Sequence, residues 1–185
     1  MRTTHSQQGF TLLESLVAIS ILLIAVVGPM SIIGRSLPQS AYARDHAIAV
    51  NLAQEGIEAV RQKRDSNMLD KWNGGPSSWD TGIVTNSYYT VDPRALPPLM
   101  LVSCGAPLVV CNSTTLFVRQ DNATGIYYQS SAGGGAVTKF QRYVFISFNA
   151  AAPEEKMITS FVTWRDSMNV SRSLTVSEYI IGVNI

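Results

Sequence analysis

The sequence predicts an α+β protein in which a long N-terminal helix packs on an antiparallel β-sheet. The first third of the chain is apolar and then amphipathic with a helical period, and the rest is divided into short segments rich in Val, Ile, Thr, Tyr and Phe. No helical stretch in this second part is long enough for a βαβ crossover, which favours antiparallel strands. The 14 basic and 13 acidic residues exclude a strongly basic nucleic-acid binder.

An apolar run opens the chain. From Phe10 to Ile33 the sequence reads FTLLESLVAISILLIAVVGPMSII, and Glu14 is its only charge. As a helix, this run is about 36 Å long, enough to cross a hydrocarbon core of about 30 Å. It therefore predicts a membrane-spanning helix. Two alternatives are a buried core helix and a secretory signal peptide cleaved after Ala43, which would release a soluble protein beginning at Arg44.

The flank of this run carries a motif. Residues 1–9, MRTTHSQQG, are short and polar, and Gly9 is followed directly by Phe10 and the sequence TLLE. This pattern resembles the processing site of type IV prepilins and of type II secretion pseudopilins. The resemblance implies that a prepilin peptidase cuts after Gly9 and methylates the new amine of Phe10. Glu14 then becomes the fifth residue of the mature chain.

The resemblance also implies a role for Glu14. Cleavage creates a positive amine at Phe10, inside the same apolar layer as the carboxylate. Because unpaired buried charges are costly, the two should be paired. In the family, this glutamate is thought to neutralise the amine of a neighbouring subunit, so we expect Glu14 to select for filament assembly.

Gly28-Pro29 interrupts the apolar run. Proline removes a backbone donor and clashes with the preceding turn, which predicts a kink or local unwinding. Pilins resemble this chain in carrying a proline in the membrane half of the helix, so Pro29 is assigned to assembly. Pro38 marks a second predicted bend.

From about Gln39 to Arg64 the pattern is amphipathic and helical. The predicted buried face consists of Ile48, Leu52, Ala53, Gly56, Ile57 and Val60, and the opposite face of Glu55, Glu58, Arg61 and Gln62. The basic run Arg61–Arg64 is expected to end the helix, where cations suit the helix dipole. A DNA-contacting patch with Lys71 and Trp72 is the alternative, and nothing else in the sequence supports a nucleic-acid partner.

Residues 65–82 are predicted to form a loop, and β-strands follow it. The predicted strands are Ile83–Asp92, Leu99–Ser103, Leu116–Gln120, Ile126–Gln129, Thr138–Phe148, Met157–Arg165 and Val170–Ile181. The last two form a hairpin in which Leu174 and Val176 face inward. This hairpin resembles the closing hairpin of some minor pilins and small pseudopilins.

Cys104 and Cys111 are the two cysteines of the chain. A bridge between them would close a small loop and contribute about 2–3 kcal/mol. Export past a membrane anchor favours a disulfide over two free thiols. We expect no metal site, because His46 is the only histidine of the predicted mature chain.

The scarcity of histidine also argues against catalysis. A Ser-His-Asp triad would have to recruit His46 from the helix, and no phosphate-binding loop is present. Asp65-Ser66-Asn67 with Asp70 lacks the full pattern of a calcium loop. We therefore expect no catalytic activity and no cofactor.

These observations predict four segments: a leader at 1–9, a transmembrane and assembly helix at 10–33, its amphipathic continuation at 34–64 and an exported β-rich domain at 65–185. The predicted function is that of a structural subunit, a minor pilin, in a type IV-pilus-like filament. The alternatives are a minor pseudopilin of type II secretion and a membrane-anchored or secreted enzyme or binding domain.

The resemblance also implies binding partners and a cellular location. The partners are other pilin subunits, prepilin peptidase, an inner-membrane assembly platform and, before assembly, membrane lipid. We expect a single-pass inner-membrane protein that later joins a pilus at the cell surface.

Overall fold

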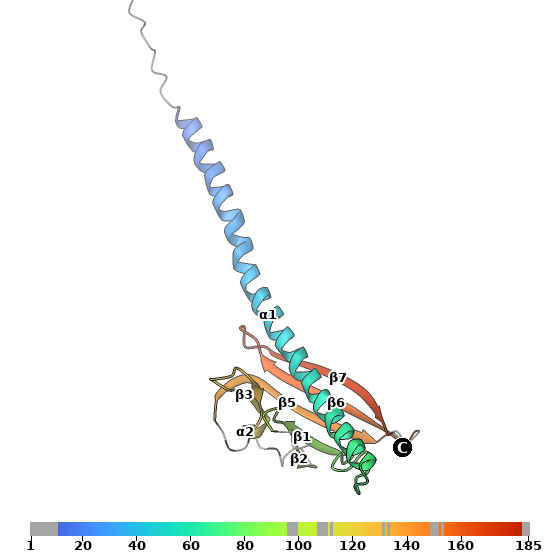
Figure 1. Ribbon diagram of the computed structural model, residues 1–185. Helices are drawn as coiled ribbons and strands as arrows, with labels where there is room; N and C mark the ends of the chain where they lie inside the picture. The colour runs from blue at the N-terminus through green and yellow to red at the C-terminus, as the bar shows by residue number, and fades with distance from the viewer. Residues whose placement is uncertain are drawn as a thin grey trace, which may run out of the picture. The chain divides into compact units, whose positions relative to one another are not determined.

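A computed structural model describes residues 11–95, 100–106, 111, 113–130, 132, 134–148, 152 and 154–182 of the chain. Its elements are α1 (Leu12–Trp72), β1 (Ser87–Val91), β2 (Leu101–Gly105), α2 (Ser113–Leu116), β3 (Phe117–Gln120), β4 (Tyr127–Tyr128), β5 (Ala136–Phe148), β6 (Glu155–Arg165) and β7 (Ser171–Ile181). A long helix with an apolar beginning and an antiparallel sheet confirm the predicted pilin-like α+β class (Figure 1). The seven predicted strands are all present, with shifted ends.

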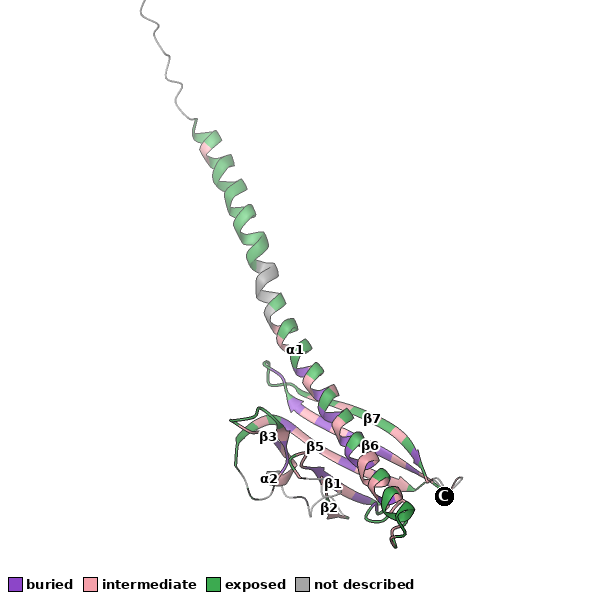
Figure 2. Cartoon of the chain, viewed as in Figure 1, coloured by how far each residue is buried: buried purple, intermediate pink, exposed green. Residues whose placement is uncertain are grey.

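The chain divides into two compact units, one ending at Tyr42 and the other running from Ala43 to Ile185. In the first unit, residues Leu12–Met30 of α1 are long and apolar enough to cross a bilayer, with a mean hydropathy of 2.3. None of this segment is buried within the chain, as the green helix of Figure 2 shows. Its apolar side chains must therefore be covered by something other than this chain.

The helix is unbroken at both prolines. α1 continues through Pro29 and Pro38, so the local unwinding expected at Gly28-Pro29 is wrong for this structure. Proline removes only one donor from the helical ladder, and neighbouring groups can satisfy the freed carbonyl. The kink itself stays a prediction.

In the second unit, the amphipathic part of α1 buries the predicted face. Leu52, Ala53, Gly56, Ile57 and Val60 are all buried, and Ile48 is half-buried. The helix packs closely here, because a Cβ added at Gly56 would lie 2.6 Å from Ser160 Oγ and 2.9 Å from Val144 Cγ2. Figure 2 shows buried residues recurring along this stretch.

The helix ends at Trp72 and not near Arg64, so the predicted loop over residues 65–72 is wrong. Asp65–Trp72 contains no glycine or proline, and the side chain of Asn67 is held inside by donating to the carbonyls of Trp79 and Thr81 at 3.0 and 2.8 Å. The helix stops where Gly74 adopts φ 82° and donates to the Lys71 carbonyl.

The basic run therefore lies within the helix and does not end it. Arg61 pairs with Glu58 and Glu178, and Arg64 pairs with Asp65. Lys71, in the last turn, is the cation at the helix end. Because two of its cations already have acidic partners, the run is not the bare basic patch that a DNA contact requires.

Strand β5 is central to the sheet (Figure 1). One of its edges pairs with β6, and the other pairs with β1 and β3 at different points along its length. Strand β2 extends the sheet from β1, β4 extends it from β3, and β7 extends it from β6, all antiparallel.

The β6–β7 hairpin confirms the predicted pairing and facing. Leu174 and Val176 are half-buried on the inner face, while Ser173, Thr175 and Ser177 are exposed. In the turn, the Asp166 carboxylate accepts the N–H groups of Met168 and Val170, both at 2.9 Å. These bonds hold the chain reversal.

The core lies between the second part of α1 and the inner face of the sheet. One cluster joins Ile57 and Val60 of the helix to Val144, Ile146 and Ile158. The other joins Ala49, Leu52 and Ala53 to Phe140, Val162 and Trp164. The sheet is thus covered on one face by a single helix.

Candidate functional site

The N-terminus of α1 is capped by Thr11. The N–H of Glu14 donates to Thr11 Oγ1 at 3.3 Å and to its carbonyl at 3.1 Å, and the N–H of Ser15 donates to the same carbonyl at 3.1 Å. A threonine cap satisfies a donor that would otherwise stay unpaired in an apolar layer. The cap also places the Glu14 carboxylate in the first turn, at the positive end of the helix dipole.

Glu14 is surrounded by exposed apolar side chains. Leu12, Leu13 and Leu16 are 91%, 75% and 66% exposed, and Glu14 is exposed among them. Within the described part of the chain, Glu14 has no ion-pair partner. The predicted processing residues Gly9 and Phe10 lie outside the described residues. The arrangement therefore leaves a carboxylate on an otherwise apolar surface of the described helix.

Residues 4–28 match the family described as the prokaryotic N-terminal methylation motif. The match includes Gly9, Phe10 and Glu14, the positions that the sequence singled out. This motif marks type IV pilin-like and pseudopilin-like prepilins. No curated protein and no solved structure matches it.

The motif implies processing by prepilin peptidase and pilus-type assembly, and the apolar helix is long enough to serve as a membrane anchor. Pilin-like proteins are usually structural subunits without enzymatic activity. Among the residues that the structure describes, no cluster of His, Cys, Asp or Glu could hold a metal ion.

Cys104 and Cys111 form the predicted disulfide. Their Cα atoms are 5.2 Å apart, within the usual range for a disulfide. Cys104 lies on β2 and Cys111 is buried just before α2. The bridge therefore ties the far end of the β1–β2 pair to the segment that enters β3.

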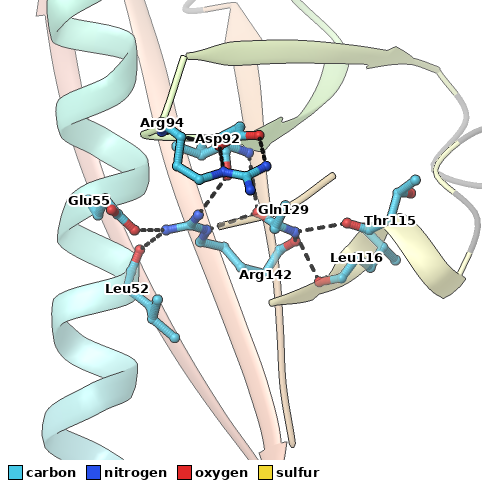
Figure 3. A network of polar contacts seen from close by, with 9 residues as sticks. Leu52, Glu55, Asp92, Arg94, Thr115, Leu116, Gln129 and Arg142 are labelled. Carbon is cyan, nitrogen blue, oxygen red and sulfur yellow. Dashed lines mark hydrogen bonds and ion pairs between the residues drawn. The ribbon is translucent and has the colours of Figure 1, made fainter. Parts of the chain in front are cut away.

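A buried arginine joins this segment to the helix (Figure 3). Arg142 of β5 is fully buried, and its guanidinium donates to the Glu55 carboxylate at 2.5 Å and to the Leu52 carbonyl at 3.0 Å. It also donates to Gln129 Oε1 at 3.0 Å and to the Val91 carbonyl at 3.1 Å. Burial lowers the pKa of the Arg142 guanidinium, and the Glu55 carboxylate opposes that shift.

Gln129 completes the network. Its side-chain amide donates to the carbonyls of Thr115, Leu116 and Arg142 at 3.2, 2.9 and 2.7 Å, and its Oε1 also accepts the Val91 N–H at 3.2 Å. Two side chains thus join helix α1 to four other segments: β1, α2, β5 and the residue that follows β4. The network fixes the sheet against this part of the helix.

A second cation lies beside the network. Arg94 makes a two-point contact with the Asp92 carboxylate at 2.8 and 2.9 Å (Figure 3). Its guanidinium lies 3.3 Å from the centre of the Tyr128 ring. The Asp92 carboxylate raises the pKa of Arg94. The Arg94–Asp92 ion pair thus lies against Tyr128, the residue directly before Gln129 in the chain.

The sequence analysis missed Arg142 and Gln129, although it contained a signal for the arginine. In β5, Phe140, Val144 and Ile146 occupy every second position and are buried. Arg142 has the same phase, and a charge in the apolar phase of an alternating strand indicates a buried, paired ion. Gln129 had no such signal, because it lies just after the two-residue strand β4.

Proposed function

We propose that the chain is a minor pilin: a structural subunit of a type IV-pilus-like filament, cut after Gly9 and polymerised through its N-terminal helix. The observation that carries the proposal is the register of Gly9, Phe10 and Glu14 in front of an exposed apolar helix. The same helix continues into a sheet-covered half, so one element joins the membrane segment to the exported domain.

In this proposal, the charge of Glu14 selects for assembly into the filament over residence in the membrane. Its carboxylate is costly in a bilayer, by about 2.5–3.5 kcal/mol on insertion scales. Its exposure and the absence of an ion-pair partner in the described part of the chain support pairing between chains. The amine of Phe10 in a neighbouring subunit would offset this cost, because opposite buried charges stabilise each other.

The second candidate is a minor pseudopilin of type II secretion. The N-terminal motif is common to both classes, and the β6–β7 hairpin resembles the closing hairpin of small pseudopilins as well as that of minor pilins. The two differ in where the mature chain accumulates, either in surface pili or in a filament confined to the cell envelope.

The test is the substitution Glu14→Gln, expressed with the native assembly machinery. We expect a mature chain that begins at Phe10 and inserts into the membrane as well as the wild type does, because removing a charge makes the run more apolar. We expect it to be depleted from sheared surface filaments at least about tenfold, which corresponds to about 1.4 kcal/mol of lost pairing.

Intact mass measures cleavage and methylation, and immunoblots of sheared and membrane fractions measure incorporation. The matched control is Glu154→Gln, which removes an exposed carboxylate from the sheet unit. Normal incorporation of the Glu14→Gln chain would contradict the pairing role. A wild-type chain found in membranes and never in surface filaments would favour the pseudopilin.

A further inference from the structure

The last strand of the sheet has a long free edge. Among the described strands, β7 pairs only with β6, in a register that runs without a bulge from Glu155↔Ile181 to Arg165↔Ser171. The other outer strands, β2 and β4, have five and two residues, whereas β7 has eleven. Natural sheets often protect such an edge with proline, a bulge or charged side chains. β7 contains no proline, lysine or bulge, and its two charged residues are Arg172 and Glu178.

A groove runs beside this edge. It has a volume of about 550 Å³, and it is lined by Gln54, Glu55, Ile57, Glu58 and Arg61 of α1 and by Val176 and Glu178 of β7. A strand added to β7 would direct every second side chain toward the helix. The groove is the space that those side chains would enter.

The lining of the groove has a distinct chemistry. Ile57 and Val176 form an apolar part, and Arg61 bonds to both Glu58 and Glu178 on the rim. Two carboxylates thus share one cation. This arrangement favours an entering strand that brings apolar side chains and one further cation.

We propose that the free edge of β7 accepts an extended strand from another polypeptide, whose helix-facing side chains are apolar except for a basic residue opposite Glu178 and an acidic residue opposite Arg172. Main-chain hydrogen bonds along β7 would supply affinity, and the groove would supply specificity. The proposal is independent of Glu14 and of whether the filament is a pilus or a secretion device.

A second copy of the chain that pairs antiparallel through its own β7 is not the occupant. β7 runs in the same direction as the α1 segment that it packs beside, because Asp45 contacts Lys139 near the start of β5 while Arg61 contacts Glu178 near the end of β7. Antiparallel pairing of two β7 strands would therefore reverse one of these α1 segments relative to the other. In a filament whose sheet units all point the same way, two copies cannot pair in this manner.

A free peptide is not bound by that restriction, and the sequence of β7 itself makes a suitable probe. In an antiparallel register centred on Thr175, the peptide SRSLTVSEYII places its own arginine opposite Glu178 and its leucine opposite Val176. Its glutamate lies opposite Arg172 in the same register. Opposite charges and apolar pairs across strands are both stabilising.

The experiment measures binding of this peptide, fluorescently labelled, to the mature full-length chain in detergent micelles. We expect saturable binding by fluorescence anisotropy. A charge-exchanged peptide, SESLTVSRYII, has the same composition and should bind about tenfold more weakly, because like charges then oppose each other. Absence of saturable binding, or equal affinities for the two peptides, would overturn the proposal.

Two further arms locate the peptide at the edge. Methyl groups on alternate backbone nitrogens all lie on one edge of a strand, so one alternately N-methylated peptide should bind and its counterpart should not. A chain with Ser177→Cys should form a disulfide with a peptide that carries cysteine at the Ser173 position, and not with one that carries it at the Ser171 position. Equal behaviour of either pair would mean that the peptide does not add as a strand to β7.

Discussion

The two parts of α1 belong to one helix, but they differ in what covers their apolar side chains. From Leu12 to Met30 its large apolar side chains are exposed, and none of the segment is buried by the chain. In the second unit, alanines, a glycine and medium-sized apolar residues such as Leu52 and Ile57 are buried against the sheet. The first part takes its apolar partners from outside the chain, whereas the second takes them from its own sheet.

This difference separates assembly from folding. A change in the first part should alter where the chain goes and leave the unfolding of the sheet unit untouched. A change in the second part should alter the stability of the sheet unit and leave the N-terminal signals intact. Three pairs of substitutions, each with a matched control, test what stabilises the sheet unit and whether the first part of α1 contributes, in order of expected effect.

Arg142→Ala should have the largest effect. Removing the guanidinium leaves the carbonyls of Leu52 and Val91 and the Gln129 side chain without their donor, so we expect a loss of about 3–5 kcal/mol in unfolding free energy. Denaturant unfolding followed by tryptophan fluorescence in micelles measures it. Arg165→Ala, which removes an exposed arginine of β6, should cost less than about 1 kcal/mol. Equal losses for both variants would show that the network does not hold the domain.

Two glycines of α1 provide a matched pair. Gly56→Ala places a Cβ 2.6 Å from Ser160 Oγ and 2.9 Å from Val144 Cγ2. We expect a net loss of about 1–2 kcal/mol, since overpacking exceeds the gain of about 1 kcal/mol in helix propensity. Gly28→Ala meets nothing within 4 Å and should leave unfolding of the sheet unit within about 0.5 kcal/mol of wild type. If Gly28→Ala lowered the stability as much as Gly56→Ala, the two parts of the helix would not be independent.

Asp166→Asn should have the smallest effect, and it should depend on pH. The Val170 N–H, the Arg172 side chain and the Met168 N–H lower the pKa of Asp166, against an opposing contribution from desolvation. A lowered pKa stabilises the fold above the unfolded value of about 3.9, and this stabilisation is lost as the pH falls through the folded value. The substitution should therefore lower Tm at pH 7 by a few degrees and lower it by less near pH 3, which is below the unfolded pKa. Asp65→Asn, on the exposed side of α1, serves as the control and should change Tm little at either pH.

Strands with clear alternation were predictable from the sequence. β5, β6 and β7 were found within two residues of their true ends, because buried and exposed side chains alternate along them. The start of β1 was placed four residues early, because Ile83 is buried without belonging to a strand. The helix end was missed for a different reason: the polar composition of Asp65–Lys71 resembles a loop, and the bonds that keep Asn67 inside the fold join it to residues 79 and 81.

The residues of the candidate site also divide into those that the sequence predicts and those that it does not. Gly9, Phe10 and Glu14 lie within one contiguous motif, residues 4–28, so the sequence contains all of this signal. The network of Arg142 and Gln129 depends on Leu52, Val91 and Thr115, which approach one another only in the folded domain. No local sequence pattern predicts that these residues lie close together in the fold.

The interlocked bonds of Arg142 and Gln129 constrain how this protein can evolve. Gln129 Oε1 receives Arg142 Nε while the Gln129 amide donates to the Arg142 carbonyl, so each side chain completes the surroundings of the other. A substitution of either residue alone leaves buried polar groups without hydrogen-bond partners and should be selected against. Homologous chains should therefore keep this pair together or exchange it together with Glu55, whereas the Ser and Thr positions on the exposed face of β7 are free to diverge independently.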